Sequence, residues 1–423
     1  MNIDTILASI DRKELAEVAL GFGNVGSPTG LEGDMGEALF QWLADQGFSP
    51  RKMEAAPERH NVVAVLKGTG GGKNLIFNAH IDTKYGAPED VWSAGELLPE
   101  YVRAWMEGDL IYGQGVFNDK GPLTATLFAA RAIRDSGVKL KGDLYITAVV
   151  GEIGTAPIDE FQGSRYLGKG FGARHLVDHG INADFALVAE CTNFSKTWAQ
   201  CGCTYFQITA RGAGFYTPFI PRPTARADSP NAVVQMAQVI NALEDWADIY
   251  IERDQVDFGG GVIKPNVSVG AIRGGLPWKI GNAVGRCSIY LDVRIPPGKD
   301  PLYVQPEIEK VIAETGVEVE ITPYMTRRGY IAEGHEPLTD SIEKAHQVVF
   351  GKPSETIFTP ITSMWRDMNI FNEVGIPSAT YGPSYTKSFS QGQESDAIHI
   401  DDLLSASKVY AQVAMDICNT DAD

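Results

Sequence analysis

The sequence predicts an α/β fold: a mixed, mostly parallel sheet whose chain is interrupted by a smaller α+β domain. The first observation is an alternation, from Asn61 onwards, of short apolar runs with segments of helical periodicity. This alternation is typical of βαβ units, whose strands pair in parallel. The second observation is a change of texture near Thr197 and a return to the first texture after Tyr330.

The elements of the larger domain each have a signal of their own. Strands are expected in short apolar runs bounded by turn residues, and helices where apolar residues recur with helical spacing. The expected strands are NVVAVLKG (61–68), NLIFNAHID (74–82), DLYITAVVGE (143–152), ADFALVAE (183–190) and PSATYGP (377–383). The expected helices are GPLTATLFAARAIRDSG (121–137), SIEKAHQVVFG (341–351) and DDLLSASKVYAQVAMDICN (401–419).

The smaller domain shows strands with one polar face and long amphipathic helices. Their order, strand–helix–strand–strand–helix–strand, is typical of a small α+β domain. We therefore expect a first part of the larger domain at 1–197, an inserted domain at 198–324 and a second part at 325–423.

Composition and charge exclude several classes of partner. The chain has 423 residues, a net charge of −18 and no apolar run of the roughly 18 residues that span a bilayer. The negative charge argues against nucleic acid and against an anionic membrane surface as partners. The N-terminus carries acids and no cleavable apolar region, and the five cysteines form no CxxC pair. These features predict a cytoplasmic protein with reduced thiols.

Potential metal ligands follow the ends of three expected strands. They are His80, Glu152 and Glu190, while Asp119 lies in a Gly-rich turn and His399 precedes the last helix. In an open α/β sheet the carboxyl ends of the strands face the ligand crevice. Acids gathered there would repel one another unless a cation neutralised them. This N/O set suits one or two divalent ions, Mn²⁺ or Zn²⁺, and Asp82 is expected to orient the His80 imidazole.

The chain also resembles a known family, the co-catalytic metallopeptidases and deacylases that include carboxypeptidase G, acetylornithine deacetylase, succinyl-diaminopimelate desuccinylase and aminoacylase. The resemblance covers nearly all of the chain and rests on HID (80–82), GQGVFNDKGPL (113–123), GEIG (151–154), AE (189–190), SMWRDMN (363–369), GIPSATYGP (375–383) and AIHIDD (397–402). It implies that Asp119 bridges two metals, that His80 and Glu190 complete one site, and that Glu152 and His399 complete the other. It also implies that the inserted domain is a lid through which a homodimer forms.

Two positions depart from the family pattern. The motif normally has two adjacent acids, a general base followed by a ligand, but the first position here is Gly151. The lid histidine that stabilises the oxyanion in relatives is matched best by Tyr216. The base and the oxyanion donor are typically worth about 10²–10⁴ and 10²–10³ in rate. Asp82, Glu394 and Asp396 are the candidates for a replacement base.

Three functions are compatible with these departures. The first is an aminohydrolase that releases ammonia from an activated aromatic amine such as 5-nitroanthranilate, where hydroxide attacks the ring and a ring substituent accepts the charge. Metal lowers the pKa of water to about 7, so this substrate would need neither lost residue. The second is a metallopeptidase or N-acyl-amino-acid deacylase with another base, and the third is an inactive metal-binding relative.

The expected substrate is small and anionic. We expect Asp82 and Glu152 to take part in catalysis. Arg366 and Arg327 are expected to bind the substrate, because guanidinium groups pair well with carboxylate or nitro oxygens, and Tyr216 is expected to bind it by stacking on a ring.

Overall fold

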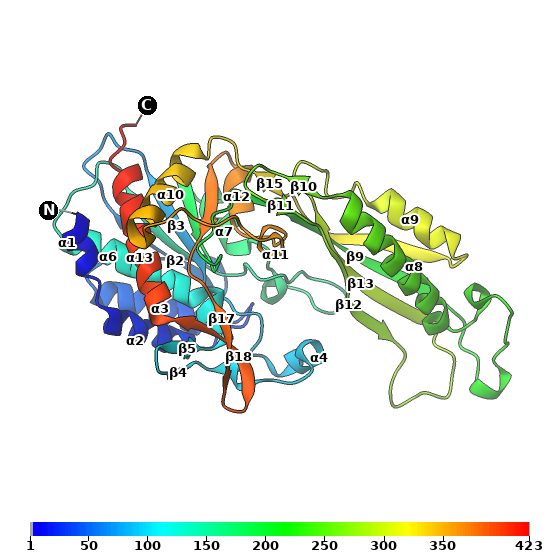
Figure 1. Ribbon diagram of the computed structural model, residues 1–423. Helices are drawn as coiled ribbons and strands as arrows, with labels where there is room; N and C mark the ends of the chain where they lie inside the picture. Colours follow the sequence, from blue (N-terminus) through cyan, green and yellow to red (C-terminus); the bar gives the residue numbers. More distant parts are fainter. Residues whose placement is uncertain (1–2, 423) are drawn as a thin grey trace. The chain divides into compact units, whose positions relative to one another are not determined.

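The computed structural model describes residues 3–422. The chain divides into two compact units, the first formed by Met1–Trp198, Ala332–Ile357 and Arg366–Asp423, and the second by Ala199–Ile331 and Phe358–Trp365. Figure 1 shows their helices and strands. Among the described residues, no helix has both the length and the hydropathy that crossing a bilayer would require.

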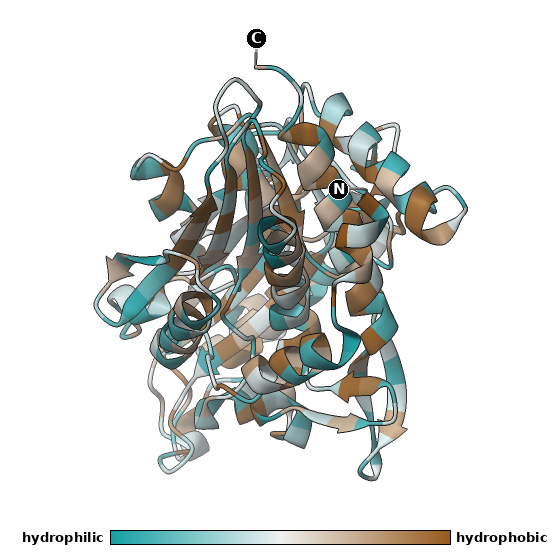
Figure 2. Ribbon diagram, turned by 90° about the vertical axis from the view of Figure 1, so that its left-hand side faces the viewer, coloured by the Kyte–Doolittle hydropathy of each residue, from teal (hydrophilic) through white to brown (hydrophobic). Residues whose placement is uncertain are grey.

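The first unit contains a six-stranded mixed sheet, as the sequence predicts. Its order is β1 (Arg51–Ala56), β2 (Arg59–Leu66), β6 (Leu144–Val149), β3 (Leu75–His80), β7 (Phe185–Ala189) and β16 (Ser378–Tyr381). The four strands from β6 to β16 are parallel, whereas β1 and β2 are antiparallel to their neighbours. The inner strands are strongly hydrophobic (Figure 2), as expected for a sheet that is covered on both faces, whereas the edge strand β1 is polar and largely exposed.

Helices cover both faces of this sheet. Alternate residues of β3 enter different cores: Leu75 and Phe77 pack into one cluster, and Ile76 packs into the other. The first cluster includes residues from α1 (Ile3–Ala8), α2 (Arg12–Gly23), α3 (Gly33–Asp45), α6 (Gly121–Asp135), α10 (Glu336–Phe350) and α13 (Ile400–Ile417). The second includes residues from α7 (Phe171–Asp178) and α12 (Met368–Glu373). The result is a three-layer α/β/α arrangement.

The first unit also has a second, smaller sheet. Its order is β17 (Thr386–Ser390), β18 (Gln393–His399), β5 (Leu110–Tyr112) and β4 (Trp105–Glu107), and all of its pairs are antiparallel. Two short helices, α4 (Val91–Ala94) and α5 (Pro99–Val102), precede β4. The strands of this sheet are short and lack a long apolar run, so no local pattern predicts them.

The second unit is the predicted α+β domain. Its four-stranded antiparallel sheet has the order β12 (Val267–Gly274), β13 (Arg286–Ile295), β9 (Gly202–Arg211) and β14 (Val319–Arg327). The helices α8 (Ala232–Arg253) and α9 (Gln305–Glu314) share one buried core with this sheet. The smaller strand pairs are β10 (Val256–Asp257) with β11 (Val262–Ile263), and β8 (Ala199–Gln200) with β15 (Tyr330–Ile331).

The second unit extends beyond the predicted boundaries of 198–324. The chain stays in it until Ile331 because β15 pairs with β8. A later segment, 358–365, also belongs to it and contains α11 (Thr359–Thr362). Thr362 donates from Oγ1 to the carbonyl of Val262 at 2.6 Å, which fastens this segment to β11. Such a return of the chain depends on contacts about 100 residues apart, which local patterns do not reveal.

Candidate metal centre

Three parallel strands of the larger sheet end beside one another. His80 is the last residue of β3, Glu152 follows β6, and Glu190 directly follows β7. The strand order β6-β3-β7 places His80 between the two glutamates along the edge. The register pairs His80 with Val149 of β6, so the chain that leads to Glu152 leaves the sheet beside the imidazole.

Asp119 reaches the same place from a turn. It belongs to the segment Val116–Lys120, directly before α6, and its side chain is fully buried. Its Oδ2 accepts a hydrogen bond from the backbone N–H of His80 at 3.3 Å, whereas its buried Oδ1 has no hydrogen-bond partner. His80, Asp119 and Glu190 each offer a ligand atom, and these atoms all lie within 4.8 Å of one another. A buried carboxylate oxygen without a partner at this point is suited to a cation.

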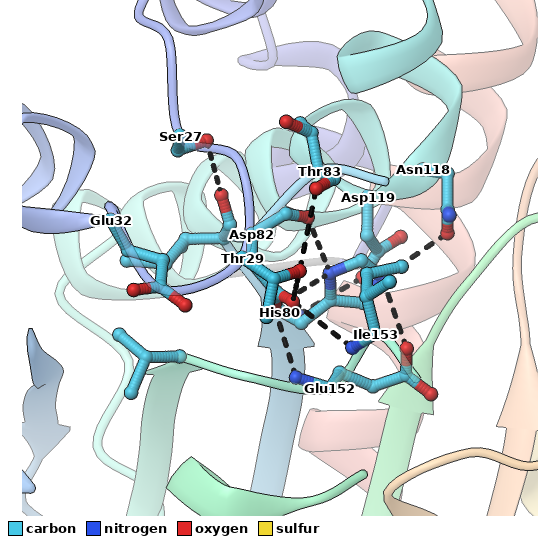
Figure 3. A network of polar contacts seen from close by, with 12 residues as sticks. Ser27, Thr29, Glu32, His80, Asp82, Thr83, Asn118, Asp119, Glu152 and Ile153 are labelled. Carbon is cyan, nitrogen blue, oxygen red and sulfur yellow. Dashed lines mark hydrogen bonds and ion pairs between the residues drawn. The ribbon is translucent and has the colours of Figure 1, made fainter. Parts of the chain in front are cut away.

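The two ring nitrogens of His80 face different surroundings (Figure 3). Nδ1 lies 2.9 Å from the backbone carbonyl oxygen of Asp82, which can only accept a hydrogen bond, so Nδ1 carries the proton. A neutral ring then presents its lone pair at Nε2, which lies 4.0 Å from Glu152 Oε2 and 4.0 Å from Glu190 Oε1. An imidazole held in this tautomer is a ready metal ligand.

Asp82 lies on the Nδ1 side of the ring and is completely buried. Its Oδ1 is 3.4 Å from His80 Nδ1 and accepts the backbone N–H of Glu152 at 3.0 Å. Its Oδ2 accepts from Ile153 N–H at 3.0 Å and from Thr29 Oγ1 at 2.7 Å. With both oxygens occupied, this carboxylate orients His80 and the Glu152 loop, a geometry that favours positioning over the role of a replacement base.

The charges of the cluster are mutually unfavourable without a cation. Burial, together with the charge of Glu190, raises the pKa of Asp119 well above its usual range. Burial likewise raises the pKa of Glu152 to about 7, although His80 opposes the shift. A divalent cation would neutralise these carboxylates, and one imidazole with several oxygens is a donor set suited to Zn²⁺ or Mn²⁺. The residues present therefore fit a metal.

Arg366 takes a position that the sequence does not reveal. Its guanidinium Nε lies 3.1 Å from Glu190 Oε2, and both side chains are almost fully buried. The contact holds the outer oxygen of Glu190 while Oε1 points towards His80. The residue that we expect to bind substrate therefore contacts a candidate ligand.

The neighbouring Asp367 is a buried member of the site that sequence reasoning missed. It accepts a hydrogen bond at Oδ2 from Asn78 Nδ2 at 3.1 Å, and its Oδ1 is buried without a partner. Burial and the charge of Glu152 raise the pKa of Asp367 well above its usual range. It lies before a short helix rather than at a strand end, so the pattern that reveals Glu152 gives no signal here.

Gly151 occupies a position that no side chain could enter without rearrangement. Its φ is +66°, and a Cβ there would lie 2.7 Å from Arg59 Nη2 and 2.9 Å from the carbonyl oxygen of Leu167. Arg59 is itself held in place by a buried ion pair with Glu32, at 2.7 Å, and by a hydrogen bond to Leu167 O at 2.9 Å. The space that an acidic side chain at position 151 would occupy is therefore filled by Arg59, which is paired with Glu32, and by the backbone of Leu167.

His399 does not join the cluster in this structure. It caps α13, where its Nδ1 accepts a hydrogen bond from the backbone N–H of Asp401 at 3.1 Å. Its side chain is 40% exposed, and it is not among the residues whose ligand atoms lie within 4.8 Å of one another. The residue before a helix favours capping, which competes with the ligand role that the resemblance implies.

The other expected residues are not members of the ligand group, and two of them belong to the second unit. Asp396 is near Lys387, with 3.5 Å between Oδ1 and Nζ, and Glu394 is exposed on the same strand β18. Tyr216 is 59% exposed and belongs to the second unit. Arg327, at the end of β14 in that unit, donates from Nη1 to the carbonyl oxygen of Thr326 at 2.9 Å.

Comparison with known proteins decides the family. The model of peptidase family M20/M25/M40 matches residues 76–416. The chain belongs to this family. Family M20 members are metal-dependent hydrolases of C–N bonds, and the chain is an enzyme of this class. The resemblance inferred from the motifs is confirmed.

Several relatives match over most of their length. The chain is 22% identical to N-formyl-4-amino-5-aminomethyl-2-methylpyrimidine deformylase of Halalkalibacterium halodurans over 90% of both chains. It is 30% identical to the deformylase of the same name from Bacillus subtilis, but only over 34% of that protein. Acetylornithine deacetylase of Vibrio atlanticus is 25% identical over 73% of this chain and 74% of its own. The substrates of these proteins are not thereby those of this chain.

The fold is also that of solved M20-type structures. A dipeptidase from Saccharomyces cerevisiae superimposes with a TM-score of 0.73 over 99% of both chains, at 12% identity. A Staphylococcus aureus tripeptidase superimposes with a TM-score of 0.70 over 97% of this chain and 100% of its own, at 16% identity. At such identities the likeness shows the fold alone.

Proposed function

We propose that the chain hydrolyses a C–N bond in a small anionic substrate at the centre formed by His80, Asp119, Glu152 and Glu190. The observation that carries this proposal is the convergence of buried N and O donors on one sheet edge: His80, Asp119 and Glu190 each offer a ligand atom within 4.8 Å of the others. Glu152 lies outside this group, but its Oε2 is 4.0 Å from His80 Nε2. A divalent cation bound there would supply a water of lowered pKa at neutral pH. Asp82 fixes the His80 tautomer.

We further propose an aromatic amine as the substrate, with 5-nitroanthranilate as the test compound. The support is the filled space at Gly151, where the family's general base cannot be accommodated. A ring with an electron-withdrawing substituent accepts negative charge during attack, so less proton transfer by the protein is needed. An amide without such a charge sink depends more on general acid–base help, typically worth about 10²–10⁴ in rate.

The alternative is hydrolysis of an amide, as in a deacylase or peptidase. The comparisons favour this version, because the named relatives include deformylases, acetylornithine deacetylase and peptidases. In this case another residue must move the proton. Asp367, buried near Glu152 and with one oxygen free of hydrogen bonds, is the carboxyl group that the structure offers in addition to the expected candidates.

One experiment separates the two versions. The full chain, loaded with Mn²⁺ or Zn²⁺, is incubated in parallel with 5-nitroanthranilate, an N-formyl or N-acetyl amine, and a dipeptide. Release of ammonia from the first compound only, abolished in Glu152→Ala, supports the aminohydrolase. Release of formate, acetate or an amino acid instead supports the amide hydrolase, and metal-loaded protein that turns over none of these classes contradicts the proposal.

We also propose that the second unit forms a homodimer and that the protein acts in the cytoplasm. The dimer is supported by β12, an edge strand of the second unit's sheet, whose Ile272 is 54% exposed. Open edges of this kind are available for pairing with another chain. Light scattering of the full chain after size exclusion tests the dimer, and a monomeric mass at micromolar concentration would contradict it.

A further inference from the structure

Two histidines share one face of α7, at the end of the helix. His175 belongs to its last turn, and His179, four residues later, is the residue that follows the helix at its C-terminus. Residues at this spacing are neighbours on a helix surface. Leu176 packs into the core, whereas His175 is half-buried and His179 is exposed. Neither histidine belongs to the ligand group of the candidate centre, so the pair is a separate feature of the first unit.

The two imidazole rings are in contact. Their centroids are 3.9 Å apart, and their planes differ by 31°. Nitrogen ligands that lie about 2.1 Å from one ion can be up to about 4.2 Å apart. Rings at this separation can therefore both reach one ion, and the exposed ring of His179 is free to turn towards it.

The hydrogen bonds of the pair leave ring nitrogens available. Nδ1 of His179 lies 2.8 Å from the carbonyl oxygen of His175, which can only accept a hydrogen bond, so this nitrogen carries a proton. In the neutral ring Nε2 then has a lone pair. The His175 ring makes no hydrogen bond within the part of the chain that the structure describes.

The charges around the pair also suit a cation. Two protonated imidazoles in contact would repel each other, and burial together with the charge of His179 lowers the pKa of His175, although Asp178 opposes the shift. A neutral imidazole is the form that binds a metal. The net charge of −18 attracts cations to the surface of the chain.

We propose that His175 and His179 form a second metal site, which binds one Zn²⁺, Ni²⁺ or Cu²⁺ through both imidazoles at the C-terminus of α7. Imidazole suits these ions, whereas Mn²⁺ and Mg²⁺ prefer oxygen ligands. Two histidines four residues apart on one helix face also occur in helical zinc motifs. With only two protein ligands, water completes the coordination, so the bound ion exchanges with solution. The inference does not depend on the proposed function or on its substrate.

The alternative is that the stacked pair only caps the helix. The hydrogen bond from His179 Nδ1 satisfies one of the last carbonyl groups of α7, and a cap of this kind needs no metal. A cap alone predicts that replacing His179 changes the thermal stability but not the number of bound ions.

The test counts the ions bound by the full chain. Equilibrium dialysis against Ni²⁺, followed by elemental analysis, is carried out on the wild type, His175→Gln, His179→Gln and the double variant. The candidate centre is present in all four proteins, so its contribution cancels and its failure would leave the comparison readable. We expect each single variant to bind the ion of this site at least about 10-fold more weakly, because losing even an outer partner of a ligand costs about 10–100-fold. The double variant should lose little more than either single variant, since both rings hold the same ion.

A second readout reaches only exposed histidines. Ni²⁺ held on a chelating resin cannot contact His80, which is 2% exposed, so retention of the untagged chain reports the surface. We expect His179→Gln to elute at a lower imidazole concentration than the wild type. His399→Gln is the matched control, because His399 is also exposed but has no histidine four residues away.

Asp178→Asn is the matched control for the dialysis. It keeps both rings and removes the exposed carboxylate beside them, so it is expected to bind Ni²⁺ like the wild type. Thermal melts verify that each variant is folded. Wild-type binding in His175→Gln or His179→Gln, an equal loss in Asp178→Asn, or retention that depends on His399 instead of His179 overturns the two-imidazole site.

Discussion

Replacing Gly151 by alanine is expected to destabilise the first unit strongly, although only one methyl group is added. The backbone has φ +66°, which costs a residue with a Cβ about 1–2 kcal/mol. The new Cβ would also lie 2.7 Å from Arg59 Nη2, 2.9 Å from Leu167 O and 3.2 Å from Phe171 Cβ. Overpacking of this kind typically costs another 1–3 kcal/mol, so the expected total is about 2–5 kcal/mol.

Arg59 cannot easily move aside to relieve this overlap. Its side chain is 2% exposed, and the guanidinium pairs with Glu32 and donates to Leu167 O. A shift would weaken a buried ion pair, and leaving one member of such a pair without its partner costs about 3–5 kcal/mol. The upper half of the range for Gly151→Ala is therefore the better expectation.

Thermal and urea unfolding of the metal-free chain measure the effect. For a unit of this size we expect the Tm to fall by roughly 5–15 °C. Gly137→Ala is the matched control, because Gly137 has φ +75° but nothing within 4 Å of its added Cβ. Its free energy of unfolding should fall by only about 1–2 kcal/mol, the cost of a positive φ for a residue with a Cβ. If the free energies of unfolding of the two variants differ by less than about 0.5 kcal/mol, roughly one RT, then overlap with Arg59 and Leu167 does not destabilise Gly151→Ala and the reasoning is refuted.

Three further predictions concern the surroundings of the centre and the stability of the first unit. Asp82→Asn should weaken Co²⁺ or Zn²⁺ binding about 10–100-fold, because Asp82 orients His80 from 3.4 Å, and unchanged affinity in a chelator competition would contradict this role. Arg366→Met should leave Glu190 buried without its partner at 3.1 Å and lower the metal-free stability by about 3–5 kcal/mol, whereas an equal or higher Tm would show that the pair contributes nothing. In Glu343, hydrogen bonds from Lys196, Ser354 and Gln347 outweigh burial and lower the pKa to about 2, so the carboxylate contributes stability above its unfolded pKa and loses it as pH falls towards 2. Glu343→Gln should therefore cost about 1–2 kcal/mol at pH 7 and progressively less below about pH 4.5, and a cost independent of pH would exclude this linkage.

The sequence could predict those parts of the site that depend on local pattern. His80, Glu152 and Glu190 each end an apolar run, and parallel strands deliver such ends to one edge. The two-domain organisation also follows from a local change of texture, although its boundary at 331 depends on the pairing of β15 with β8.

The remaining features depend on contacts between distant segments. The glycine at 151 is visible in the sequence, but the reason for it is Arg59, which lies 92 residues earlier and fills the space. The role of Arg366 depends on Glu190, and Asp367 is recognised only because Asn78 and Glu152 lie near it. His399 shows the opposite case, since its motif indicates a ligand whereas the structure places it as a helix cap.

The buried pair of Glu32 and Arg59 has a consequence for how this enzyme could have diverged. An acid at position 151 would overlap Arg59, but losing Arg59 alone leaves Glu32 buried without this partner, and losing Glu32 alone removes the partner of Arg59. Each single substitution towards the two-acid motif is therefore expected to destabilise the first unit. Positions 32, 59 and 151 are therefore coupled: the effect of an acid at position 151 depends on which residues stand at the other two, and the three substitutions are not expected to be additive.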